Sequence, residues 1–180
     1  VTSVKPGDRV AMLAAEHKKH IHMEKPGSTV LSDFEKLVET VKKNKTVFHI
    51  GYMYRYNPYI SNLTDRVKAG ELGEIISVEA QMSGYHPAKL RSWLKAFHGG
   101  IMFFLGCHLI DLILQIHGIP ERIIPLNKST GFDNIDNTDF GMAVLECKNG
   151  LSFAKTTDIE CGVFLRRQLV VTGTKGMVEV

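Results

Sequence analysis

Cysteine is scarce in this 180-residue sequence, and its placement excludes the common paired-cysteine motifs. The three cysteines, Cys107, Cys147 and Cys161, are odd in number and lie far apart, with no CxxC spacing. This pattern favours a reduced, cytoplasmic protein, and it predicts no metal site.

Long hydrophobic runs and an excess of one charge are also absent. No apolar run reaches the roughly 18 residues that a membrane-spanning helix needs, and the sequence does not open with a signal-like segment. The net charge is only +3, and the basic residues are scattered along the chain. We therefore expect a soluble protein that binds neither nucleic acid nor membrane.

Residues 1–74 alternate short β-like runs with helical stretches, which is typical of parallel α/β units. Strands are predicted at residues 1–4, 20–23 and 46–52. The first helix is expected to start at Asp8 and to run to about Lys18. The second carries a capping-box signal, Ser32 with Glu35, and the third begins at Asn57 and Pro58.

Beyond residue 74 the pattern changes to that of a mainly antiparallel sheet. Apolar and polar residues alternate from residue 76 to residue 83, and one long helix is predicted over residues 101–117. Two alternating runs, 140–147 and 151–157, flank Asn149 and Gly150, a dipeptide that favours a two-residue hairpin turn. A second hairpin is expected between residues 168–172 and 177–180.

One long helix can cover only one face of such a sheet. In the run 140–147, Met142 and Val144 point to one face, and Ala143 and Leu145 point to the other. Apolar residues on both faces predict a homodimer or homotetramer that associates through the open face. We expect a charge at Ala143 or Leu145 to dissociate it.

Two short motifs follow predicted strands, where ligands bind in open α/β sheets. Glu24, Lys25 and Pro26 come directly after the strand at residues 20–23, although most such lysines are surface residues of a turn. The segment Gly51 to Pro58 holds three tyrosines and Arg55. It suits a ligand pocket, or equally a plain helix start at which Asn57 is the cap and the tyrosines pack.

The third motif is a glycine pair, Gly99 and Gly100, that leads into the long helix. Phe104, His108 and Asp111 are spaced i, i+4 and i+7 on this helix, so a regular α-helix would present them on one face. A single His near an Asp is more often a structural pair than an acid/base group. A lysine elsewhere in the site would make His108 an acid/base candidate.

Together the three motifs resemble the Gfo/Idh/MocA family of oxidoreductases, which carries Glu-Lys-Pro, Arg-x-Asn-Pro and Gly-x-His-x-x-Asp in this order. The resemblance implies an α/β followed by α+β fold. Residues 1–74 would be the C-terminal half of a Rossmann dinucleotide-binding domain. Residues 75–180 would be a substrate-binding and oligomerisation domain, incomplete at its C-terminus, with an open-faced sheet covered by a long helix.

The resemblance also implies roles for individual residues. Lys25 and His108 would be catalytic, with His108 as the proton acceptor. The cofactor would be bound by Pro6, Glu24, Lys25, Pro26, Arg55 and Asn57. The substrate would be bound by Lys25, His108 and Asp111. In the family the peptide bond matching Lys25-Pro26 is often cis.

The implied function is an NAD(P)-dependent dehydrogenase that moves a hydride between nicotinamide and a secondary alcohol of a sugar, inositol or related polyol. Phe104 stands where many members have Asp, which favours an alternative, a non-catalytic sensor of the same fold. No GxGxxG turn occurs, so the sequence leaves NAD and NADP open. We expect a preceding segment of more than a hundred residues in the natural protein, and only weak nucleotide binding by these 180 residues alone.

Overall fold

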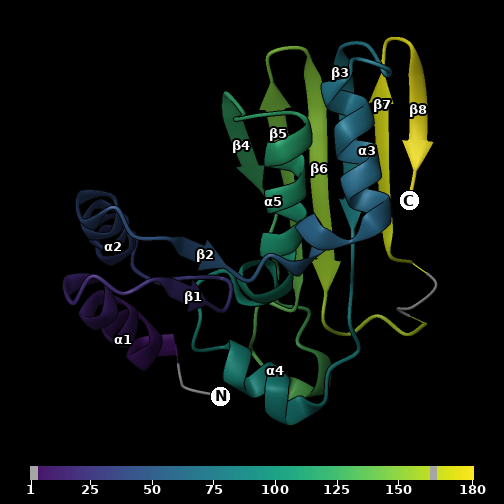
Figure 1. The fold of residues 1–180 in the computed structure, drawn as a ribbon. Helices are drawn as coiled ribbons and strands as arrows, with labels where there is room; N and C mark the ends of the chain where they lie inside the picture. The colour runs from purple at the N-terminus through teal and green to yellow at the C-terminus, as the bar shows by residue number, and fades with distance from the viewer. Residues whose placement is uncertain (1–3, 163–165) are drawn as a thin grey trace. The chain divides into compact units, whose positions relative to one another are not determined.

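The computed structural model describes residues 4–162 and 166–180, and it describes the side chains of the first helix only from Arg9 onward. The chain divides into two compact units, Val1–Tyr52 and Met53–Val180. Figure 1 labels the helices and strands of both units. No helix in the described part of the chain is long and apolar enough to cross a membrane.

The first unit confirms the predicted parallel α/β pattern. It contains α1 (Val4–Glu16), β1 (Ile21–Met23), α2 (Leu31–Asn44) and β2 (Phe48–Ile50). Strands β1 and β2 are parallel, with His22 opposite His49. Their core is a small apolar cluster formed by Ala11, Ala15, Ile21, Leu37 and Val41.

Two predicted boundaries in this unit are wrong. Helix α1 already includes Val4 and Asp8, so Asp8 lies inside the helix instead of starting it, and the rest of the predicted strand at residues 1–4 lies outside the described residues. Helix α2 is entered from Val30, which has extended backbone dihedral angles and makes no side-chain cap. Ser32 is therefore already inside the first turn and cannot act as the predicted cap.

The second unit is built on a six-stranded sheet in the order β4-β5-β6-β3-β7-β8. Only β3 and β6 pair in parallel, which confirms the mainly antiparallel prediction. The strands are β3 (Ile75–Gln81), β4 (Arg122–Pro125), β5 (Phe140–Cys147), β6 (Gly150–Thr157), β7 (Gln168–Gly173) and β8 (Gly176–Glu179).

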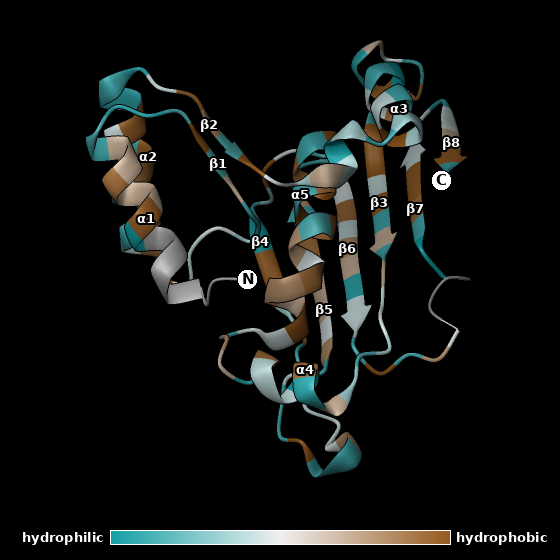
Figure 2. Ribbon diagram, turned by 60° about the horizontal axis from the view of Figure 1, so that its bottom comes forward, coloured by the Kyte–Doolittle hydropathy of each residue, from teal (hydrophilic) through white to brown (hydrophobic). Residues whose placement is uncertain are grey.

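Two helices, α3 (Pro58–Lys68) and α5 (Cys107–Ile116), lie against one face of this sheet (Figure 1). The shared core includes Leu63 of α3, Ile113 of α5, and Val78 and Leu145 of the sheet. In Figure 2, brown hydrophobic residues alternate with paler and teal ones on these strands. The shorter helices of the unit are η1 (Met53–Tyr56), α4 (Ala88–Leu94), the π-helix η2 (Met102–Gly106) and η3 (Phe132–Asn134).

The compact units divide between Tyr52 and Met53, whereas the sequence suggested a change near residue 74. Helix α3 belongs to the second unit because its residues Ile60 and Leu63 are buried in the core that α3 and α5 share with the six-stranded sheet. Amphipathic spacing predicted this helix but gave no information on its packing partner. The assignment of residues 1–74 to a nucleotide-binding domain stays a prediction.

The two faces of β5 are reversed relative to the prediction. Ala143 and Leu145 are 6% and 0% exposed and pack under the helices, while Met142 and Val144 are half-buried on the other face. Alternation alone cannot say which side the helices cover, because both sides of this strand are apolar. A charge at Ala143 or Leu145 would therefore enter the core.

The hairpin between β5 and β6 is confirmed, but its turn lies one residue earlier. Cys147 pairs with Gly150, so the two-residue turn is Lys148 and Asn149. Gly150 belongs to the strand, where a Cβ atom would lie 2.0 Å from the backbone oxygen of Ile76. Glycine is required there by the close approach of another backbone.

The burial difference along β5 generates a stability prediction. Replacement of Leu145 by Ala should lower the free energy of unfolding by about 2 to 4 kcal/mol, because it leaves a cavity in a fully buried site. Val144→Ala, on the open face, is the matched control and should cost less than half as much. Urea unfolding measures both, and equal losses would contradict the observed orientation of the strand.

Candidate functional site

In the first unit, the predicted motif residues lie at the carboxyl ends of the two parallel strands. Glu24, Lys25 and Pro26 follow β1 directly, and the Lys25-Pro26 peptide bond is cis. Gly51 follows β2, and a Cβ atom there would lie 3.3 Å from Oε2 of Glu24. The absence of a side chain at Gly51 lets the Glu24 carboxylate lie over the neighbouring strand end.

In the second unit, the dominant polar contact joins Arg55 of η1 to Asp111 of α5. The guanidinium donates two hydrogen bonds to the carboxylate, one of them from Nε to Oδ2 at 2.9 Å. The side chain of Asp111 is 10% exposed, and Gln115 Nε2 also donates to Oδ2 at 2.9 Å. A buried carboxylate is tolerated here because a planar cation meets both of its oxygens.

His108 lies one turn before Asp111 on α5 and is buried, with 5% exposure. Its ring meets the ring of Tyr54 edge to face, with centroids 5.1 Å apart. The structure therefore brings His108, Asp111, Tyr54 and Arg55 together at the contact of α5 with η1. The catalytic and binding roles assigned to these residues from the sequence stay predictions.

Tyr54 also borders a cavity of about 320 Å³. Its hydroxyl donates to Met82 Sδ at 3.1 Å and accepts a hydrogen bond from Arg167 at 3.2 Å. The cavity is mostly apolar and is lined by Tyr54, Asn57, Ile60, Gln81, Met82, Leu109, Leu112, Arg167, Gln168, Leu169 and Val180. The tyrosine-rich segment was predicted as a possible pocket wall, but no sequence motif indicated Met82, Arg167 or Gln168 as lining residues.

The entry to α5 differs from the regular helix that the sequence predicted. Residues Met102–Gly106 form a π-helix, so the spacing from Phe104 to His108 is not that of an α-helix. The ring of Phe104 meets those of His86 and Trp93 edge to face, at 6.3 and 5.8 Å. Phe104 thus packs toward the α4 side, whereas His108 packs on Tyr54.

Asn57 and Pro6 are the remaining residues that were predicted to bind the cofactor. Asn57 is the N-cap of α3, since its side chain accepts a hydrogen bond from the backbone N–H of Tyr59 at 2.9 Å. Pro6 lies in α1, in the part whose side chains fall outside the description. Among the described residues, no group of three or more His, Cys, Asp or Glu is placed to hold a metal ion.

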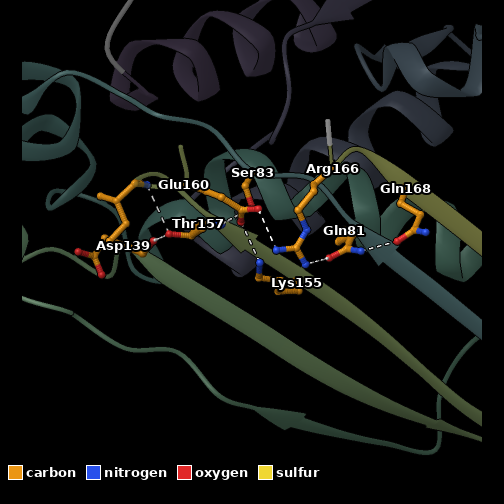
Figure 3. Close-up of polar contacts among 9 residues, drawn as sticks. Gln81, Ser83, Asp139, Lys155, Thr157, Glu160, Arg166 and Gln168 are labelled. Atoms are coloured by element: carbon orange, nitrogen blue, oxygen red, sulfur yellow. Dashed lines mark hydrogen bonds and ion pairs between the residues drawn. The ribbon is translucent and has the colours of Figure 1, made fainter. Parts of the chain in front are cut away.

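A polar chain that sequence reasoning missed crosses the sheet near the ends of β3, β6 and β7 (Figure 3). Glu160 pairs with Lys155 at 2.8 Å and with Arg166 at 3.3 Å, and Arg166 donates to Gln81. The hydrogen bond from Lys155 is the largest cause that lowers the pKa of Glu160. Gln81 in turn bonds Gln168 on β7. Gln81 is more than 80 positions from Arg166 and Gln168, so no local pattern connects β3 with the rest of this chain.

Comparison with known families matches residues 60–179 to the GFO/IDH/MocA C-terminal domain. A curated relative, 2,7-anhydro-N-acetylneuraminate hydratase of Escherichia coli, is 26% identical over 179 residues, which cover 93% of this chain and 46% of the relative. The scyllo-inositol 2-dehydrogenase (NAD(+)) of Bacillus subtilis is 34% identical over 114 residues, or 62% of this chain and 32% of that protein.

The fold is shared with solved structures. An inositol dehydrogenase homolog from Azotobacter vinelandii, complexed with NADH and myo-inositol, superposes with a TM-score of 0.88 at 20% identity. The match covers 99% of this chain and 48% of the other. The chain spans about half the length of the curated relatives it matches.

The Arg55–Asp111 contact generates the prediction for this site. Arg55→Met should lower the free energy of unfolding by about 1 to 3 kcal/mol, because the Asp111 carboxylate stays buried without its cation. The double variant Arg55→Met with Asp111→Leu should recover part of this loss. A double-mutant cycle by urea unfolding tests the coupling, and simple additivity of the two substitutions would contradict it.

Proposed function

The chain belongs to the GFO/IDH/MocA family, and from that premise we propose that it is part of an NAD(P)-dependent dehydrogenase acting on a secondary alcohol of a sugar, inositol or related polyol. The proposal is supported by relatives and structural neighbours that act on or bind inositol or sugars, several with NAD. Bound nicotinamide would supply the hydride acceptor for alcohol oxidation.

The burial of His108 beside Tyr54, one helical turn from the Arg55–Asp111 pair, is the observation that carries this proposal. Oxidation of an alcohol requires a base for the hydroxyl proton, and imidazole suits this task near neutral pH. The carboxylate of Asp111 already accepts bonds from Arg55 and Gln115. We therefore assign proton acceptance to His108 and the support of its helix to Asp111.

Lys25 is assigned to the substrate hydroxyl, which its ammonium would polarise. Its position after β1 is the one at which open α/β sheets present ligand-binding groups. Glu24 is assigned to the cofactor-binding set because its carboxylate lies over the end of β2, where the missing side chain of Gly51 admits it. Pro6, Pro26, Arg55 and Asn57 complete the proposed cofactor-binding set.

The rival function is a sensor that binds nucleotide and sugar without turnover. It is favoured by Phe104, whose apolar ring packs against Trp93 and His86 at the position where many family members have an Asp carboxylate. A screen of sugars and polyols with the full-length natural protein, followed by nicotinamide absorbance, separates the two. Absorbance change with a polyol supports the dehydrogenase. Saturable ligand binding without any absorbance change across the screen supports the sensor.

We also propose that the protein is a homo-oligomer that associates through the open face of the six-stranded sheet. Within the described part of the second unit, no helix covers that face. Its apolar side chains include Val144 on β5 and Phe153 on β6, which are cross-strand partners, and Val170 on β7. Glu79 of β3 lies between Phe153 and Val170 in the strand register, so the apolar part of the open face is the β5–β6 pair. Adjacent apolar side chains on an uncovered sheet face are typical of a subunit interface.

Lys25→Ala in the full-length protein should lower turnover by about 100-fold or more, because polarising and acid/base groups usually contribute at least that much. Cofactor affinity should stay within a few-fold of its normal value. Lys36→Ala, an exposed lysine of α2, is the matched control and should leave turnover unchanged. Steady-state kinetics measures both, and near-normal turnover of the Lys25 variant would remove this residue from the site.

Val144→Lys should dissociate the oligomer at micromolar concentration, because it places a charge on the open face without entering the core. Lys128→Ala outside the strands is the control for a general effect of altered charge. Sedimentation velocity reports the state of each variant. A wild-type protein that sediments as a monomer would rule out the proposed association.

A further inference from the structure

A buried carboxyl and a buried carboxamide form an incomplete pair beyond the end of β6. Asp158 is 0% exposed and Asn137 is 3% exposed. Asn137 Nδ2 donates to Asp158 Oδ2 at 3.0 Å. The second oxygen of each side chain, Asp158 Oδ1 and Asn137 Oδ1, is buried without a hydrogen-bond partner among the described residues. Two acceptors of one hydrogen-bonded pair thus lack a donor, which is costly inside a protein.

The charged groups around Asp158 do not provide that donor. Arg91 of α4 forms its ion pair with Asp133, and its Nε is buried without a hydrogen-bond partner among the described residues. Asp139, which precedes β5, has a carboxylate that accepts two hydrogen bonds from Thr130.

His86 completes the set of titratable neighbours. Its backbone N–H donates to the backbone oxygen of Asp158 at 2.8 Å. Burial, and then the charge of Arg91, lower the pKa of His86, so its ring is neutral at neutral pH. The charges that act on the Asp158 carboxyl are therefore one cation engaged elsewhere and one anion, and the imidazole that follows its backbone partner is neutral.

We propose that Asp158 is protonated in the folded protein at mildly acidic pH and that its Oδ1–H donates to Asn137 Oδ1, so that the two side chains form a pair closed by two hydrogen bonds. A carboxylic acid offers one O–H donor, and a carboxamide offers both a donor and an acceptor. A single proton therefore satisfies both remaining oxygens. An ionised Asp158 would instead place two bare acceptors side by side.

The electrostatic surroundings agree with this assignment. The pKa of Asp158 is raised to about 6, with burial as the largest cause and the nearby charge of Asp139 as a second one that acts in the same direction. The hydrogen bond from Asn137 and the charge of Arg91 act in the opposite direction but do not restore the ordinary value.

The pair lies where it can position the helix that carries His108. The backbone oxygen of Asp139 accepts a hydrogen bond from Asp158 N at 3.0 Å. It also accepts one from Thr157 Oγ1 at 2.7 Å, and Figure 3 shows these two residues side by side. The preceding residue, Thr138, accepts the backbone N–H of Ile101 at 3.0 Å, just before η2. Asp158 and Asn137 are therefore positioning residues, because they hold residues 137–139 between the end of β6 and the entry to α5.

The pair makes stability depend on pH in a defined direction. Asp158 ionises near its ordinary value, 3.8, in the unfolded chain and at about 6 in the folded protein. Its contribution to stability is therefore complete below about pH 4, is lost as the pH rises toward 6, and stays lost at higher pH. Asp158→Asn removes this dependence but keeps both hydrogen bonds, since its Nδ2 can donate to Asn137 Oδ1.

The test compares thermal unfolding of the intact wild-type protein, Asp158→Asn and Asp158→Ala at pH 4.5 and pH 8. The unfolding temperature of Asp158→Asn minus that of wild type is the quantity to compare. This difference should increase by roughly 5 °C or more between pH 4.5 and pH 8. Asp158→Ala should unfold below Asp158→Asn at both pH values. Destabilisation of Asp158→Asn at pH 8 to the level of Asp158→Ala would overturn the proposal, because it would mean that the charge is needed.

A spectroscopic measurement observes the proton directly. The infrared difference spectrum of wild type minus Asp158→Asn at pH 5 should contain the C=O stretch of a protonated carboxyl, and its absence would refute protonation. The matched control is Asp139→Asn, whose carboxylate is equally buried but accepts two bonds from Thr130. That variant should lose stability at both pH values and should keep the protonated-carboxyl band.

The positioning role has its own readout, and only this readout rests on the proposed function. With an active polyol substrate, Asp158→Ala should lower kcat at least several-fold, and Asp158→Asn should restore it. An unchanged kcat in Asp158→Ala would refute positioning while leaving the protonated pair intact. If the full-length wild type oxidises no polyol at all, the proposed function fails, and the infrared and unfolding results still decide the pair.

Discussion

The burial of one face of the six-stranded sheet beneath α3 and α5 is the constraint on which the second unit depends. Four core residues of this layer are each at most 1% exposed, namely Leu63, Val78, Ile113 and Leu145. Removing an apolar side chain of this kind from water contributes about 1.5 to 3 kcal/mol to the free energy of folding. Because α5 must place its apolar side on the sheet, its orientation about its own axis is set. His108 and Asp111 thereby come to lie at the edge of that contact, next to η1.

Two glycines allow close approaches at the start of α5, and at Gly100 the neighbouring atom is a backbone oxygen that cannot move aside. A Cβ atom on Gly100 would lie 2.3 Å from the backbone oxygen of Thr138, and one on Gly106 would lie 2.2 Å from Met102 Sδ. The first contact brings the turn before η2 against the strand loop at residues 137–139. The second belongs to the π-helix itself, where the wider turn brings Met102 against Gly106. Helix, loop and sheet are therefore positioned together.

Buried carboxyl groups in this unit are accommodated in different ways. Asp111 meets the guanidinium of Arg55, and Asp139 accepts two hydrogen bonds from Thr130. Among the side chains that the structure describes, Asp158 has the amide of Asn137 as its donor. Asp111 lies on α5, and Asp139 and Asp158 adjoin strands that contact α5 or η2, so these buried carboxyl groups are gathered around the helix that carries His108. Each group is costly to bury, and each therefore restricts the positions of its neighbours.

Local sequence patterns were sufficient to predict most of the long helices and strands, the change from parallel α/β units to a mainly antiparallel sheet, and the motifs that identify the family. These features are local, since periodicity, caps such as Asn57 and short motifs depend on neighbouring residues. The packing in three dimensions established which face of β5 is covered, that α3 packs in the second unit, and that Arg55 pairs with Asp111. It also decided the contact of Asn137 with Asp158, residues 21 positions apart. Such contacts depend on which elements meet in space. A pattern of apolar and polar residues predicts whether a segment is a helix or a strand, but it does not indicate which other element that segment packs against.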